Sequence, residues 1–412
     1  MAAWDAALTV LPPTHPRRIG RALLALGVMV LIPATACSIA LMNLGLGLAL
    51  GGALLARAPL GRVPGLWWGA ALAAWGALSM VSVIALGRHA HPYNGFGLLY
   101  TWLAFPVAWL ACREAGTRRV VAWGLVATLA AAVALSLVQY TVGLREDLRP
   151  FRVGGGPSAL RFTFANGFFS THLTLAAVMM ALLIALAGRL RHDLPRWAGW
   201  AAVVLAATGL VLSSGRLAFV GLLAALAVWG VLGDRRRALA ALVGGGALLA
   251  VAITVLALTQ GPRLKAMLRG EDGRWMIWQT TAHLIAETPL VGSGGSRAFT
   301  ERYAVLNPQL HDGRTGEFPM GAPHAHNSLL SISAEHGVPA AILYLLLLSA
   351  LVLAAWRRRD QDADAWRLAT ALVAGMLAAG MFEHLAGDGE SALVLFALLG
   401  ALTAPRREET PA

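Results

Sequence analysis

One long polar stretch interrupts an otherwise apolar chain at residues 259–331, which read TQGPRLKAMLRGEDGRWMIWQTTAHLIAETPLVGSGGSRAFTERYAVLNPQLHDGRTGEFPMGAPHAHNSLLS. The stretch is basic, since it carries Arg263, Lys265, Arg269, Arg274, Arg297, Arg302 and Arg314. It ends in the histidine segment 323–328 (PHAHNS), directly before a new apolar run. The pattern predicts a large loop on a membrane-embedded helical bundle. The histidines are expected at the end of this loop, where the chain enters the membrane again.

The composition of the whole chain is that of a membrane protein. Of its 412 residues, 58% are hydrophobic and 13% are charged, and the mean hydropathy is +0.65. Soluble domains carry about a quarter charged residues. The formal charge of +12 is therefore expected to set topology and to meet lipid headgroups or anionic substrates, not nucleic acid. The two cysteines, Cys37 and Cys112, lie beside different apolar runs and indicate neither a disulfide framework nor a metal site.

Apolar runs of about 20 residues recur along the chain, which is the transmembrane-helix signal. They predict an all-α polytopic membrane protein, a single transmembrane domain over residues 1–412 with about twelve helices. The spans are expected at 20–35, 38–56, 65–86, 96–112, 119–142, 167–187, 197–212, 216–232, 238–258, 327–355, 365–384 and 390–404. The loop 259–326, with short helices of its own, is inserted between helices 9 and 10.

Basic residues in the connections predict the orientation of this bundle. Each connection on one side carries at least two arginines, and that side includes both chain ends. The arginines are Arg17, Arg18 and Arg21; Arg57 and Arg62; Arg113, Arg118 and Arg119; Arg189, Arg191 and Arg196; Arg235, Arg236 and Arg237; Arg357, Arg358, Arg359 and Arg367; Arg406 and Arg407. Because cytoplasmic loops are enriched in Lys and Arg, this side and both termini are expected in the cytoplasm.

Two outer connections, 143–164 and the long loop, are nevertheless strongly basic. Solvated loop charge or contact with anionic lipid headgroups would account for this. A polyanionic substrate would account for it too, and phosphate is the anion that the arginine fork matches best. We favour a phosphate-bearing substrate at the outer face.

Three arginines stand where helices are expected to begin near that face. Arg161 leads into the sixth span, Arg216 opens the eighth, and Arg274 opens a helix inside the loop. Ser213 or Ser214 is a candidate cap for the helix that begins at Arg216. A helix N-terminus presents unpaired N–H groups and a positive dipole end, so an arginine there is favourable when an anion binds to both. A snorkelling arginine at the membrane boundary is the alternative.

Inside the long loop, Asp272 is expected to cap an amphipathic helix that reaches about Ala286 and lies on the membrane interface or the bundle. The glycine-rich run 289–296 (PLVGSGGS) then closes this helix. It lacks both the lysine–serine pair and the preceding strand of a phosphate-binding loop. We expect a flexible turn there rather than a phosphate cradle.

The histidine segment carries the sharpest indication of chemistry. Asn327 is predicted to cap the tenth span, with Ser331 and Glu335 following on one face of that helix. Glu335 would then lie two turns into the membrane, where an acid is functional by default. A histidine at the outer surface, as expected for His324 and His326, can accept a proton from a hydroxyl.

Other interpretations of these residues stay open. The histidines could be hydrogen-bonded interfacial residues, or could bind a metal with Glu335, although no second ligand cluster with zinc spacing occurs. His336 and His311 are the further ligands of that metal interpretation. The polar residues of the last connection are expected to be solvated loop residues, with the lining of a groove as the alternative: Glu383, His384, Asp388 and Glu390.

Taken together and in order, these segments resemble the O-antigen ligase and polymerase superfamily over roughly residues 161–344. The segments that carry the resemblance are 213–216, 274–278, 288–294 and 324–329, followed by Glu335 and Gly337. The resemblance implies a GT-C-type, metal-independent inverting glycosyltransferase of the bacterial inner membrane, with no cofactor and a periplasmic active site. Its donor would be a polysaccharide on undecaprenyl diphosphate, and in ligases its acceptor a sugar of the lipid A–core.

The same resemblance implies roles for individual residues. His326 would be the general base, with His324 as the other candidate, and Arg161, Arg216 and Arg274 would hold the diphosphate. The expected supporting residues are Ser214, Asn327 and Glu335. The chemistry agrees, because a diphosphate neutralised by arginines is a good leaving group without a metal.

An O-antigen ligase is therefore the expected function. A polymerase or protein O-oligosaccharyltransferase of the same superfamily would carry the same residues. The alternative of another class is an anionic-lipid transporter or flippase. That class predicts internal repeats and charges within both halves of the chain, whereas here no repeat is evident and the charges crowd one outer face.

Overall fold

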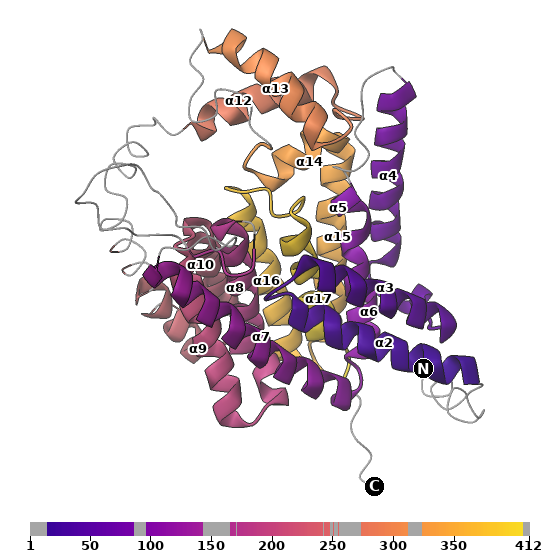
Figure 1. The fold of residues 1–412 in the computed structure, drawn as a ribbon, viewed down its shortest axis with the longest axis vertical. Helices are drawn as coiled ribbons and strands as arrows, with labels where there is room; N and C mark the ends of the chain where they lie inside the picture. Colours follow the sequence, from indigo (N-terminus) through magenta and orange to yellow (C-terminus); the bar gives the residue numbers. More distant parts are fainter. Residues whose placement is uncertain are drawn as a thin grey trace.

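The computed structural model describes residues 15–85, 96–142, 165–169, 171–241, 243–247, 250, 254, 273–311 and 324–406. Within these residues every regular element is a helix and no strand occurs. Figure 1 shows a helical bundle with two helices, α12 and α13, set on one end of it.

The N-terminal helices follow the predicted apolar runs. They are α2 (His15–Ala34), α3 (Ile39–Leu55), α4 (Leu66–Ala85), α7 (Ala115–Val142), α8 (His172–Ala187), α9 (Arg196–Ser213) and α10 (Arg216–Val231), with 3₁₀ turns η1 (Leu60–Arg62) and η4 (Leu190–Asp193). The fourth run is not one helix but α5 (Phe96–Tyr100), η3 (Thr101–Leu103) and α6 (Ala104–Ala111). Pro106 explains this correction: it has no N–H to donate to the carbonyl of Trp102, so the helix restarts with proline in its first turn.

The C-terminal helices are α12 (Arg274–Glu287), α13 (Ser296–Leu310), α14 (Ser328–His336), α15 (Val338–Trp356), α16 (Ala363–Gly380) and α17 (Gly389–Thr403). The tenth predicted span is therefore broken between α14 and α15. The break lies at Gly337. Its φ of +85° ends the helix, and a residue with a side chain would be strained in this backbone conformation. Glu335 lies in the last turn of α14, about two turns after its cap, and its depth in the membrane stays a prediction.

In the part of the chain that the structure describes, four helices are long and apolar enough to cross a membrane: α4, α7, α9 and α15. The same part contains five shorter apolar helices, at Ile39–Leu55, Leu98–Ala111, His172–Ala187, Arg216–Val231 and Gly389–Thr403. The described part of the chain is thus that of a membrane protein. The number of twelve spans and their orientation stay predictions.

The centre of the bundle is α17. Its residues are buried all round from Ser391 to Thr403, as befits a helix that is apolar on every face. It contacts α6, α8 and α16. The connection that precedes α17 is thereby held firmly inside the molecule.

At one end of the bundle, ion pairs join connections that are distant in sequence. Asp193 lies 3.1 Å from Arg118 and 3.4 Å from Arg406. Arg189 pairs with Asp362 at 2.6 Å, and Arg237 pairs with Asp364 at 3.0 Å. These contacts bring together connections that the charge pattern assigns to one common side.

Helices α2 and α3 pack backbone against backbone. The contact is made by Gly20 and Gly27 of α2 and by Gly45 and Gly52 of α3, each pair one heptad apart. A Cβ on Gly27 would lie 2.3 Å from the backbone nitrogen of Ala49. Small residues allow such close approach between helices in a membrane, where burial of apolar surface gives no driving force.

This packing makes Gly27→Ala a sharp test of the α2–α3 contact. The added methyl must push the helices apart, so we expect the apparent midpoint of thermal unfolding to fall by about 5 °C. Gly47→Ala is the matched control, because Gly47 lies in α3 with nothing within 4 Å of its Cβ position. Alanine there should leave the midpoint equal or raise it slightly. Equal losses in both variants would contradict the contact.

Candidate active site

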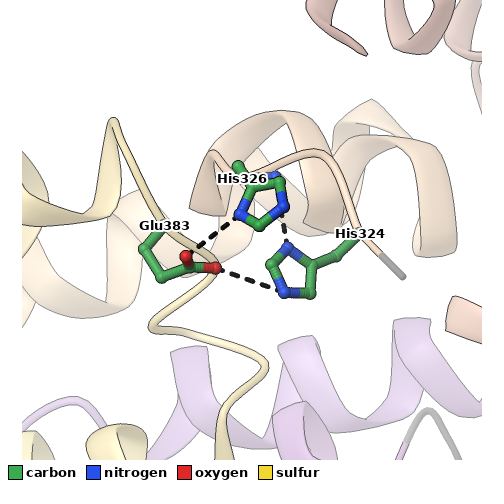
Figure 2. A group of neighbouring side chains, drawn as sticks. All are labelled: His324, His326 and Glu383. Atoms are coloured by element: carbon green, nitrogen blue, oxygen red, sulfur yellow. Dashed lines mark hydrogen bonds and ion pairs between the residues drawn. The ribbon is translucent and has the colours of Figure 1, made fainter. Parts of the chain in front are cut away.

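The carboxylate of Glu383 holds two imidazoles at the head of α14 (Figure 2). Its Oε2 lies 3.0 Å from Nδ1 of His326, and its Oε1 lies 3.2 Å from Nε2 of His324. The ring centroids of the histidines are 4.4 Å apart. The side chains of all three residues are largely withdrawn from solvent, with exposed fractions of 25% for His324, 12% for His326 and 10% for Glu383.

The bonding partners fix the proton positions on both rings. An ionised carboxylate only accepts hydrogen bonds, so Nδ1 of His326 must carry the proton that points at Glu383. In that neutral tautomer the lone pair of His326 is on Nε2. For His324 the reverse holds: Nδ1 accepts the backbone N–H of His326 at 3.2 Å, and Nε2 donates to Glu383. The lone pair of His324 therefore already accepts a hydrogen bond. The lone pair of His326 lies on Nε2, the ring nitrogen that does not bond to Glu383.

Local hydrogen bonds hold the segment in this shape. Asn327 caps α14, as predicted, by accepting from the backbone N–H groups of Leu329 and Leu330 at 3.1 Å. Ser331 Oγ, one turn on, accepts the N–H of Ala325 at 3.0 Å. His326 has a left-handed backbone with φ of +47°, a conformation uncommon for residues other than glycine and met at functional sites.

A second acid–histidine pair lies behind the first. His384 Nε2 is 3.6 Å from Oε1 of Glu335, and the backbone N–H of His384 donates to Glu383 Oε1 at 2.9 Å. The expectation that Glu383 and His384 are solvated loop residues is wrong, because they are 7% and 8% exposed. Gly387 makes room for this pair, since a Cβ there would lie 1.9 Å from His384 Nε2.

Burial and hydrogen bonding set the charges of the cluster. Burial alone would raise the pKa of Glu383, but the hydrogen bond from His326 and the proximity of the His324 ring lower it to about 2. Burial lowers the pKa of His324 to about 4. The negative charge of Glu383 raises this pKa, but offsets only part of the effect of burial. Burial also raises the pKa of Glu335 to about 8. At neutral pH the cluster therefore contains one ionised carboxylate, Glu383, beside a neutral His324.

The loop helices reach the histidines through a small core of their own. It consists of Ile277, Leu284, Phe299, Tyr303, Ala325 and Ala334. Trp278 Nε1 donates to the carbonyl of Ala325, between the two histidines, at 3.1 Å. Arg274 precedes Trp278 by four residues on α12, so both share a face of that helix and start about 6 Å apart along it. Arg274 thus lies one helical turn from Trp278, the residue that bonds to the histidine segment.

The glycine-rich turn has a structural task instead of a phosphate-binding one. Its N–H groups at Ser293 and Gly294 donate to the carbonyls of Ala334 and Glu335, at 2.8 and 2.9 Å. Gly292 must lack a side chain, since a Cβ would lie 2.5 Å from the backbone of Glu335. The turn therefore closes the C-terminal end of α14, and its donors are used there. It is an ordered docking element, unlike the flexible turn that we expected.

The start of α10 differs from expectation in its cap. The N-cap residue is Gly215 and no side chain caps the helix, so the prediction that Ser213 or Ser214 does so is wrong. Ser213 Oγ bonds instead to Leu210 O at 2.6 Å, and Ser214 takes a left-handed backbone with φ of +53°. Arg216 is nevertheless the first residue of α10, as predicted.

Two predicted residues, Arg161 and the cap Asp272, lie outside the described residues. The joint action of Arg161, Arg216 and Arg274 on one diphosphate therefore stays a prediction. His311 lies away from the cluster, at the end of α13, where its Nε2 is 3.2 Å from Thr280 Oγ1.

The same three side chains could also surround a metal ion. The possible ligand atoms of His324, His326 and Glu383 lie within 4.8 Å of one another. Two imidazoles and a carboxylate are a donor set that zinc accepts. However, hydrogen bonds already join these atoms, and a metal would have to replace them. The geometry thus fits a hydrogen-bonded acid–histidine cluster as it stands.

Comparison with known proteins finds one similarity, in the second half of the chain. Residues 201–345 match the family model described as O-antigen ligase. Over this part, about a third of the chain, the protein is similar to the O-antigen ligase family. The match runs from α9 into α15, so it includes Arg216, Arg274 and the histidine segment, whereas Glu383 lies beyond it. No curated protein matches the chain.

The substitution Glu383→Gln tests the hydrogen-bonded cluster, because glutamine has nearly the same size and shape as glutamate. The amide can turn its NH₂ group toward Nδ1 of His326, which shifts the ring proton to Nε2 and removes the basic lone pair there. We expect the turnover of glycosyl transfer by the purified protein to fall on the order of 10²-fold or more, with little change in donor KM. Glu301→Gln, at an exposed ion pair on α13, is the matched control. Retained turnover in Glu383→Gln would exclude this role.

Proposed function

We propose that this protein is an O-antigen ligase. It transfers a polysaccharide from undecaprenyl diphosphate to a hydroxyl of a lipid A–core sugar, at the periplasmic face of the bacterial inner membrane. The observation that supports this most directly is the Glu383–His326 hydrogen bond of 3.0 Å, which directs the basic nitrogen of a histidine away from its carboxylate. The similarity of residues 201–345 to the O-antigen ligase family supports the choice of substrate classes.

The proposed reaction is a single inverting displacement. The acceptor oxygen attacks the anomeric carbon of the donor sugar, and the bond between that carbon and the diphosphate oxygen breaks with its electron pair leaving on the diphosphate. Nε2 of His326 takes the acceptor proton. Glu383 remains ionised and stabilises the imidazolium that forms, as a carboxylate does in an acid–histidine pair.

The arginines would supply the electrostatic part of catalysis. Arg274 at the first turn of α12 and Arg216 at the first turn of α10 would each combine a guanidinium with a helix N-terminus, and Arg161 would join them. Their charge would stabilise the departing diphosphate in the transition state. No metal or other cofactor is required by this scheme.

We assign the base to His326 and not to His324, and the hydrogen bonds of His324 support this choice. Nδ1 of His324 accepts a hydrogen bond from the backbone N–H of His326, and Nε2 of His324 donates one to Glu383. His324 therefore positions the loop and the carboxylate, and His326 is the base. Asn327 and Ser331 support His326 by fixing the start of α14.

His326→Ala should remove attachment of polysaccharide to the core. General-base catalysis contributes about 10²–10⁴-fold, enough for the core-linked ladder to vanish on a lipopolysaccharide gel from a deletion strain carrying the variant. Lipid-linked polysaccharide should accumulate instead. His283→Ala, an exposed histidine on α12, serves as the control and should preserve the ladder. A normal ladder with His326→Ala would end the assignment, and polysaccharide of altered length with normal attachment would indicate a polymerase.

Chelation tests the metal-free scheme separately. Purified protein, lipid-linked donor and lipid A–core acceptor should give the same initial rate with and without excess chelator, because hydrogen bonds already join the acid and the histidines. Restoration of a lost rate by one divalent ion would instead make the His324, His326 and Glu383 cluster a metal site. Measurement of the rate after dialysis against chelator distinguishes the two.

A further inference from the structure

A cavity of about 600 Å³ lies between α8, α10 and α16, at the end of the bundle that holds the arginine ion pairs. Its size is within the range of about 300–1,000 Å³ typical of small-molecule sites. Its walls are apolar, formed by Leu183, Ile184, Leu222, Leu226, Trp229 and Leu368. A polar rim of arginines and aspartates closes one side of it. The cavity thus has the two-part lining that suits an amphipathic ligand.

The rim is positively charged. Four arginines line the cavity (Arg189, Arg191, Arg237 and Arg406) against two aspartates (Asp362 and Asp364). Arg189, Arg237 and Arg406 each form an ion pair with an aspartate. Arg191 differs, because within the described residues it forms no ion pair with a carboxylate. Its guanidinium lies 4.4 Å from the ring centroid of Trp200, and its Nε is buried without a hydrogen-bond partner. A buried guanidinium donor of this kind is costly unless an acceptor reaches it.

This cavity is remote from the histidine cluster. Helix α16 begins beside the cavity at Asp362 and ends just before Glu383. Its 18 residues make it about 27 Å long, close to the ~30 Å thickness of a hydrocarbon core. The cavity and the histidines therefore lie at opposite ends of α16, and the cavity lies on the side that the charge pattern assigns to the cytoplasm.

Tryptophans mark the membrane boundary at the level of the cavity. Trp197 and Trp200 lie in the first turns of α9, directly after the turn that carries Arg191, and are 69% and 51% exposed. Exposed tryptophan collects at the headgroup level of a bilayer. The rim arginines are thus at the depth of phosphate groups, and the apolar walls extend from them toward the hydrocarbon.

We propose that this cavity binds an anionic phospholipid of the cytoplasmic leaflet, with its phosphate on Arg191 and an acyl chain along α10. Arginine forks recognise phosphate oxygens, and the cytoplasmic leaflet is the one that supplies anionic headgroups near polybasic segments. The apolar walls at Leu222 and Leu226 favour a lipid over a free anion. Such a lipid would hold the ends of α8, α10 and α16 together, independently of the proposed function.

Native mass spectrometry of the full-length, delipidated protein in detergent tests this site. We expect one phosphatidylglycerol to bind saturably, and zwitterionic phosphatidylcholine to bind about tenfold more weakly. Arg191→Gln should weaken phosphatidylglycerol about tenfold by removing a charged hydrogen bond. Ala187→Phe should do the same by filling the cavity, because Ala187 lines it and is exposed, so the core is not disturbed.

Arg359→Gln is the matched control. Arg359 also stacks on a tryptophan, 4.2 Å from the centroid of Trp356, but does not line the cavity. This variant should bind phosphatidylglycerol like the wild type. Equal binding of both lipids, or wild-type affinity in Arg191→Gln and Ala187→Phe with unchanged helicity, would overturn the proposal. Displacement of the lipid by millimolar inorganic phosphate would identify a free-anion site and would likewise overturn it.

Discussion

The candidate site depends on one buried carboxylate. Glu383 accepts from Nδ1 of His326, Nε2 of His324 and the backbone N–H of His384, so its charge is compensated where water is largely excluded. Without these donors a buried carboxylate would take up a proton or become exposed. The bond to His326 also joins segments 57 residues apart in the chain. The position of the histidine is therefore set by the last connection of the bundle as well as by the loop before it.

Much of the helical framework could be predicted because helix formation in an apolar run depends on local length and hydropathy. The breaks could not, because a hydropathy window averages over single residues. Pro106 and Gly337 each divide an apolar run, one by a missing N–H and the other by a left-handed backbone. The second break affects the candidate site, since it places Glu335 in the last turn of a short helix and not within a long continuous one.

The site itself was predicted in part. His324, His326 and the cap Asn327 follow from their place before an apolar run, whereas Glu383 was assigned to solvent. No local pattern shows that Glu383 meets a residue so distant in sequence. A signal was nevertheless present, because Glu383 and His384 stand in a short connection between two apolar helices, α16 and α17. Ionisable residues beside apolar helices are functional candidates by default. For Glu383 and His384 this rule predicts better than the general expectation that polar loop residues are solvated.

Helix α16 connects these features mechanically. At its start, Asp362 pairs with the buried Arg189, and along its length Gly375 meets the backbone of α10, where a Cβ would lie 2.9 Å from Gly221 O. At its end, Gly380 packs against Ser328, whose Oγ donates to Glu383 O at 3.1 Å. Backbone-to-backbone contact leaves little freedom for the helix to slide or tilt. The carboxylate that bonds to the histidines therefore follows directly on a helix that is fixed at both ends, so the bundle helps to determine the positions of His324 and His326.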